Sequence, residues 1–306
     1  MTVAAALLAG GWAAVLRTQH PDAPSDLTPV LLGARAFLSG EHPFDVVAMS
    51  TTWRGGLLYP FTAVTALLPF AWVPGLVINV GWVAVSAAWL AWMVTKDGVT
   101  PRLVMLLSPA MIHAVHTSQW TPLLTAAALS KWGGALLACK PTTAVWLFAY
   151  SPKPRHLLGA LLLTLVSLLL WPRWPMAWQT AVLDKAIYTV WPLALPLAPL
   201  VLAALLRWRD PGARLLVTMA LVPHTMQIYE TLPLFLIATT WVDAGVLWTG
   251  SVLVTALHNA MGPYPNGTEW TRASGRLIIW LLYIPALVMI LRPEWLKVRR
   301  HRGPGL

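Results

Sequence analysis

The chain has 306 residues, of which 58% are hydrophobic and only 10% are charged, and its formal net charge is +10. Soluble globular domains carry roughly 25% charged residues, so this composition, with a mean hydropathy of +0.65, excludes such a domain and indicates an integral membrane protein. The densest basic cluster lies near the C-terminus, at 297–302, which disfavours nucleic-acid binding and fits the excess of Lys and Arg in cytoplasmic segments.

Cysteine and tryptophan usage agrees with this class. The single cysteine, Cys139, excludes an intrachain disulfide framework and lies in an apolar run, where we expect it to pack as a small hydrophobe. Nineteen tryptophans are present, and several flank apolar runs. Such placement is typical of the aromatic belts at the two membrane surfaces.

The first 16 residues are apolar. They contain no basic residue, and no clean cleavage site precedes Arg17. We therefore expect a retained first helix rather than a signal peptide. It is short, because a span usually needs about 20 residues.

A polar loop at 17–56 follows, and it holds Asp22, Asp26, Glu41 and Asp45 among the chain's eleven acidic residues. Within it, apolar residues recur at helical spacing from Leu27 to Leu38, which predicts a short amphipathic helix at the membrane surface. Asp26 stands at its N-cap and Pro29 in its first turn. This loop is either an interfacial connector with a capping aspartate or part of a functional site.

The remainder reads as a succession of apolar segments, which together with the first helix predict about ten transmembrane or partial segments in a single all-α membrane domain over 1–306. Two segments are interrupted, one by Lys140-Pro141 and one by Pro223-His224 and Tyr229-Glu230, as in broken or re-entrant helices. The expected apolar segments are 57–73, 74–95, 103–116, 120–130, 135–150, 157–170, 191–206, 215–241, 242–257 and 277–291.

The basic segments predict the topology. Placing 96–102, 151–156, 207–214 and the tail 292–306 in the cytoplasm leaves 17–56, 171–188 and a polar turn at 259–274 outside. The formal glycosylation sequon Asn266-Gly267-Thr268 is then expected to be a turn. Residues 57–95 could cross twice, whereas this scheme needs an odd number of crossings. Either 57–73 inserts only partly or one side is misassigned.

Polar groups at membrane depth cost a few kcal/mol each and usually face a cavity with partners. Each could alternatively sit at a helix end with its head at the interface. His113 and His116 could supply half a metal site, but no acidic residue or cysteine stands near them in sequence, and we predict no metal. The candidates are Arg54, His113, His116, Gln119, Lys140, His224, Tyr229, Glu230 and His258.

Four segments, in order, resemble motifs of the GT-C superfamily, and specifically of bacterial polyprenyl-phosphate-mannose-dependent mannosyltransferase-like membrane proteins. Three departures from that pattern are Phe61 for a second proline, Ser118 for a glycine and Pro122 for an asparagine. The chain is also short for that family. The four segments are Asp26-Leu27 leading to 34–44, Leu58-Tyr59-Pro60-Phe61 with Leu67-Leu68-Pro69, 118–124 with Gly133-Gly134 and Lys140-Pro141-Thr142, and Pro223-His224 with 229–234.

The resemblance implies an inverting transfer of mannose or another hexose or pentose from a polyprenyl-phosphate donor, at the outer face of the bacterial cytoplasmic membrane. Asp26 would be the general base, with Asp22, one helical turn away, as its rival. No metal or other cofactor is expected, and the partners would be membrane lipid and the lipid-phosphate sugar. Residues expected to bind the substrate or its phosphate are Arg35, Arg54, Tyr59, His116, Gln119, Lys140, His224, Tyr229 and Glu230, with Lys185 also available.

Two alternatives remain. The eroded motifs and short length would also suit a non-catalytic membrane subunit or degenerate homologue that keeps the fold. A transporter is less well supported, because the sequence shows no inverted repeats with matching broken helices.

Overall fold

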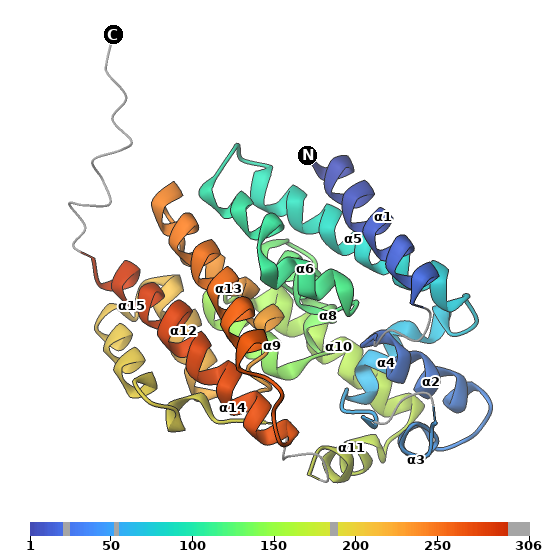
Figure 1. Ribbon diagram of the computed structural model, residues 1–306. Coiled ribbons are helices and arrows are strands. Elements are labelled where there is room, and N and C mark those ends of the chain that lie inside the picture. Colours follow the sequence, from blue (N-terminus) through green and yellow to red (C-terminus); the bar gives the residue numbers. More distant parts are fainter. Residues whose placement is uncertain (21–24, 52–54, 184–188, 293–306) are drawn as a thin grey trace.

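The computed structural model describes residues 1–20, 25–51, 55–183 and 189–292 of the chain (Figure 1). Within these ranges the regular elements are helical, and the β-structure is limited to an isolated bridge between Val190 and His224. The prediction of an all-α fold is confirmed for this part of the chain.

The helices of the N-terminal half are α1 (Thr2–Gln19), α2 (Leu27–Leu38), α3 (Pro43–Ala48), α4 (Phe61–Leu67), η1 (Leu68–Phe70), α5 (Gly75–Thr95), η2 (Pro101–Leu107), α6 (Pro109–His116), α7 (Thr121–Leu129), α8 (Gly134–Leu137) and α9 (Pro141–Tyr150). Those of the C-terminal half are α10 (Pro154–Leu170), α11 (Trp174–Leu183), η4 (Pro192–Ala194), η5 (Ala198–Arg207), α12 (Pro211–Leu221), η6 (Ile228–Ile237), α13 (Trp241–Met261), α14 (Gly267–Ile278), η7 (Ile279–Tyr283) and α15 (Ile284–Leu291). Many begin with proline, whose fixed φ and missing N–H suit the first turn of a helix.

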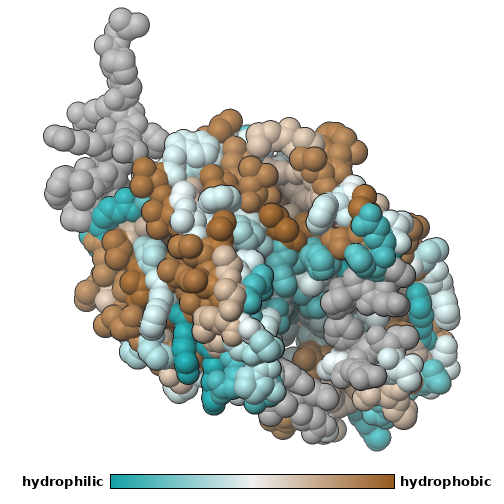
Figure 2. Space-filling view, in the orientation of Figure 1, coloured by the Kyte–Doolittle hydropathy of each residue, from teal (hydrophilic) through white to brown (hydrophobic). Residues whose placement is uncertain are grey.

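Two helices in the described ranges are long and apolar enough to cross a membrane. They are α5 and the continuous run from Gly267 to Leu291, and the pair α10–α11, bent by 101°, would count as a third. Figure 2 shows apolar side chains over the outer surface of the α13 to α15 region, where Trp241, Leu253 and Val288 are exposed. These features support a membrane protein, whereas the arrangement of about ten segments stays a prediction.

The expected polar turn at 259–274 is wrong in its second half, because α14 already begins at Gly267. The side chain of Asn266 accepts a hydrogen bond from the backbone N–H of Glu269 at 2.9 Å and so caps the helix. The formal sequon therefore starts a helix. The polar stretch expected at 171–188 contains a helix, α11, over Trp174–Leu183.

Helix length favours one of the two alternatives for residues 57–95. α4 and η1 together cover only Phe61–Phe70, roughly 16 Å, about half of a 30 Å hydrocarbon layer. They pack against α2. This short length favours partial insertion of 57–73, which stays a prediction, and α5, with α1 packed along it (Figure 1), is the helix of this region that is long enough to span.

The basic turns gather at one end of the molecule. The charges of Lys96 and Lys153 lie close enough to interact, and Arg214 donates to the carbonyl oxygen of Ala149 at 2.7 Å. Asp26 lies at the other end, where α7 and α9 begin. Lys96, Lys153 and Arg214, from three segments assigned to the cytoplasm, thus lie at the end of the fold opposite Asp26, although which end faces the cytoplasm stays a prediction.

Two introduced cysteines test this arrangement. Met49→Cys is on the Asp26 end and Asp97→Cys on the basic end, and both positions are exposed. We expect an impermeant maleimide added to intact cells to label position 49 and to reach position 97 only after the membrane is opened. The native Cys139 is buried and serves as the unlabelled background. Labelling of position 97 from outside would reverse the assigned topology.

Close packing of α13 against η7 depends on Gly250. A Cβ at this position would lie 2.2 Å from the carbonyl oxygen of Leu281, whereas a Cβ on Gly245 in the same helix would meet nothing within 4 Å. Small residues let helix backbones approach this closely in membranes.

We expect Gly250→Ala to lower the unfolding temperature, because overpacking costs about 1–3 kcal/mol. Gly245→Ala should leave it unchanged or slightly raised, since alanine favours a helix. Thermal unfolding followed by circular dichroism in amphipol measures both. Equal unfolding temperatures for the two variants would contradict this account of the packing.

Candidate functional site

Asp26 and Tyr59 form the first part of the site. The phenol of Tyr59 donates a hydrogen bond to Oδ2 of Asp26 at 2.5 Å, and the backbone N–H of Asp26 donates to the carbonyl oxygen of Thr117 at 2.9 Å. Asp26 stands at the N-cap of α2, as predicted, but its side chain makes no capping hydrogen bond. The Ser25 hydroxyl instead accepts from the N–H of Leu27 at 3.3 Å, which leaves the Asp26 carboxylate directed to the site.

Lys140 is the cation of the site and lies in the break between α8 and α9. Its Nζ lies 3.9 Å from Oε1 of Glu230, and the two side chains are 13% and 3% exposed. Nζ is also 5.0 Å from the ring centre of Tyr229 and 5.9 Å from that of Tyr59, within the range of cation–π attraction. Because the residue before a proline disfavours the helical conformation, Pro141 keeps Lys140 outside α9, at the N-terminal end of the helix.

Glu230 is fixed by the start of η6. Its Oε2 accepts from the hydroxyl of Thr225 at 2.8 Å and from the backbone N–H of Gln227 at 3.2 Å. This leaves Oε1 facing Lys140. One carboxylate oxygen therefore positions the side chain while the other carries the ion pair.

Aromatic rings enclose these charges. His113 stacks on Tyr229 with ring centres 5.7 Å apart, and Trp120 packs beside Tyr59 at 5.8 Å. His224 lies against Trp146 at 4.6 Å, and its imidazole is near enough to Glu230 and Lys140 for their charges to interact. Because the Lys140 and Glu230 side chains are only 13% and 3% exposed, their charges interact more strongly than they would in water.

Burial raises the pKa of Asp26 above the ordinary value for an aspartate, because a carboxylate loses hydration in an apolar site. The charge of Lys140 and hydrogen bonds from Tyr59 and Gln119 act in the opposite direction, and the charge of Glu230 adds to the rise. Asp26 is thus a carboxylate whose proton affinity is increased, as a general base requires.

A second polar network holds the loops that carry Asp26 and Gln119. Asn79 on α5 accepts through Oδ1 from the hydroxyls of Ser25 at 2.6 Å and Ser118 at 2.7 Å. Arg17 donates to the same Ser118 hydroxyl at 3.3 Å. Sequence reasoning missed Asn79 and Arg17, because a lone polar residue within or at the end of an apolar helix gives no pattern that names its partner.

The structure brings together most of the residues singled out from the sequence. Arg35 does not join them, since its Nε donates to the carbonyl oxygen of Ala71 at 2.6 Å. The His116 side chain lies toward the charges of Arg17 and His20 on the α1 side. Arg54, Asp22 and Lys185 lie outside the described residues. Those brought together are Asp26, Tyr59, Gln119, Lys140, Tyr229 and Glu230, with His224 beside them.

Metal binding finds no support in the described ranges, where no group of three or more His, Cys, Asp or Glu side chains is placed to hold an ion. His113 is engaged with Tyr229 instead. The groups that the cluster offers are two carboxylates, one ammonium group, two phenols and the amide of Gln119, with the imidazole of His224 beside them.

Comparison with known proteins adds no family to this description. No protein-family model matches the chain, and neither a curated protein nor a solved structure matches it.

The Lys140–Glu230 pair can be tested without knowing the function. Lys140→Met leaves buried carboxylates without their cation, which typically costs about 3–5 kcal/mol, so we expect a clear fall in unfolding temperature. The double variant Lys140→Met/Glu230→Gln should lose less than the sum of the two single variants, because both ends of the pair are then neutral.

Arg272→Met is the matched control. Its partner Glu269 lies 3.1 Å away, but the two side chains are 51% and 44% exposed, and exposed pairs contribute only about 0–1 kcal/mol. Additive losses in the Lys140–Glu230 cycle would show that the two charges do not stabilise each other.

Proposed function

We propose that the chain is a membrane glycosyltransferase that moves a sugar from a polyprenyl-phosphate donor to an acceptor with inversion, in a polytopic GT-C-like fold. The observation that carries the proposal is that a carboxylate and an ammonium group contact the same phenol, since Tyr59 donates to Asp26 and its ring centre lies 5.9 Å from Nζ of Lys140. A base and a cation in one site are what sugar transfer from a phosphate requires. The four sequence segments that resemble the family add support.

In this reaction the acceptor oxygen forms a bond to the anomeric carbon as the bond from that carbon to the phosphate oxygen breaks. The acceptor proton passes to Asp26, and the electron pair of the broken bond stays on the leaving lipid phosphate. Attack from the face opposite the phosphate inverts the configuration. Lys140 would offset the charge that develops on the phosphate, and Tyr59 would hold Asp26 in its ionised form.

The site would face the outside of the bacterial cytoplasmic membrane, with the basic end and the C-terminus in the cytoplasm. Asp26 directly precedes α2 and lies outside the long apolar helices. An acceptor that is too polar to cross the bilayer could reach a carboxylate placed there.

A non-catalytic relative is the second candidate, and one observation favours it. Asp26 already accepts from Tyr59, and Lys140 already pairs with Glu230, so the base and the cation have partners inside the protein. In a relative without activity the same contacts would simply stabilise the fold. Turnover separates the two candidates.

The test follows label lost from radiolabelled polyprenyl-phosphate-mannose incubated with purified protein in lipid. We expect wild-type protein to transfer or slowly hydrolyse the sugar and Asp26→Asn to lose about 10²–10⁴-fold in rate, the usual contribution of a general base. Glu269→Gln, which changes an exposed carboxylate, should keep full activity. Full activity in Asp26→Asn would overturn the assignment, and donor binding without turnover in wild type would favour the non-catalytic relative.

The pH dependence gives a further prediction. Turnover should fall as the pH falls through the raised pKa of Asp26, because a protonated carboxyl group cannot accept the acceptor's proton. Tyr59→Phe removes a hydrogen bond that lowers the pKa of Asp26, so its acid limb should move to higher pH. Initial rates across pH for the two proteins measure this, and coincident acid limbs would contradict the role of Tyr59.

A further inference from the structure

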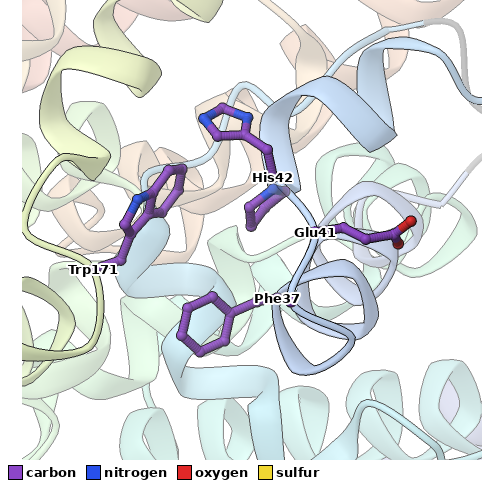
Figure 3. A pocket seen from close by; sticks show the side chains of 6 residues that line it. Phe37, Glu41, His42 and Trp171 are labelled. Atoms are coloured by element: carbon purple, nitrogen blue, oxygen red, sulfur yellow. The ribbon is translucent and has the colours of Figure 1, made fainter.

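A recess lined by aromatic side chains lies at the far end of α2 from Asp26. It has a volume of about 270 Å³. Figure 3 shows the rings of Trp171, Phe37 and His42 around it, with the carboxylate of Glu41 directed away from the rings. Its lining residues are Phe37, Gly40, Glu41, His42, Pro43 and Trp171.

The rings are held in place by contacts behind the recess. Trp171 makes edge contacts with Phe61 and His42, with ring centres 5.1 Å and 4.9 Å apart. The ring centres of Phe37 and Phe61 are 4.9 Å apart. Nδ1 of His42 lies 3.0 Å from the carboxylate of Asp45. Since these side chains are already ordered, a ligand would lose little entropy in fixing them.

Size and charge narrow the class of ligand. The volume is below the roughly 300–1,000 Å³ of sites for drug-sized molecules, so one small ring fits better than a chain. The nearby carboxylates of Glu41 and Asp45 disfavour a phosphate. Aromatic rings can also bind a quaternary ammonium, but the acidic residue among those that line the recess, Glu41, directs its carboxylate away from the rings and so would not neutralise a bound cation (Figure 3). A neutral ring with an apolar face and polar edges is the remaining fit.

We propose that this recess binds one pyranose ring of the acceptor, with its C–H face against Trp171 and Phe37 and its hydroxyls near His42. The choice of a sugar rests on the proposed function. α2 has 12 residues, so at 1.5 Å per residue the recess lies roughly 18 Å from Asp26. The bound ring is therefore a distal unit of the acceptor and not the one that reacts.

The test is saturation-transfer NMR with methyl α-D-mannopyranoside, methyl α-D-glucopyranoside, tetramethylammonium and inorganic phosphate as separate probes. The protein is held in amphipol, because sugar-headed or choline-headed detergents would compete. We expect a glycoside to receive saturation, in wild type and equally in Asp26→Asn. Binding by Asp26→Asn is independent of turnover. If the transfer assay fails but a glycoside still binds, the proposed transferase function is rejected and the proposed sugar site is retained.

Trp171→Leu and the exposed His42→Ala should each raise the glycoside Kd about fivefold or more, since aromatic anchors dominate such sites. Trp72→Leu, which alters a tryptophan 70% exposed elsewhere, should leave it unchanged. Thermal unfolding identifies any variant that fails to fold. If Trp171→Leu fails to fold, glycoside binding by His42→Ala tests the proposal. Overturning results are no saturation of either glycoside in folded wild type, unchanged binding in His42→Ala, or binding of tetramethylammonium or phosphate in place of the glycosides.

Discussion

The arrangement of the site depends on one constraint, the need to pair an ammonium group within an apolar chain. An unpaired Lys140 would be costly to bury, and its nearest carboxylate, Glu230, comes from a segment 90 positions later in the sequence. Pairing them requires α9 and η6 to begin side by side. Lys140 directly precedes α9 and Glu230 lies in the first turn of η6, so both charged side chains come from the starts of their helices.

From this pair the contacts extend to Asp26 through Tyr59. The ring of Tyr59 lies near the cation and its phenol donates to Asp26, while the ring of Tyr229 lies near the same ammonium group. Asn79 then fixes the backbone on both sides of the carboxylate by binding Ser25 and Ser118. The carboxylate is consequently positioned by α5, α7, α9 and η6 together, and its raised proton affinity is a property of their packing rather than of the loop that carries it.

The sequence predicts the parts of this arrangement that depend on local chemistry. The break at Lys140-Pro141, the helix over 27–38 and the helical class all follow from proline placement and apolar spacing, and the structure has them. It does not distinguish Lys140 from Arg35, because both are basic residues near helix ends and only tertiary packing directs one inward and the other to Ala71. The start of α14 was missed for a related reason. Residues 267–274 are polar, and the cap at Asn266 determines their helix.

Helix α2 connects the two proposed sites, and this determines how an acceptor would lie between them. α2 carries Asp26 at its first turn and Phe37 near its last, and it is buried along most of its length against α3 and α4. A rigid helix fixes the distance between a carboxylate and an aromatic recess in a way that a loop cannot. If both sites act on one acceptor, binding of a distal ring would orient the chain toward Asp26, and the separation of the two ends would favour acceptors of several sugar units over a single one.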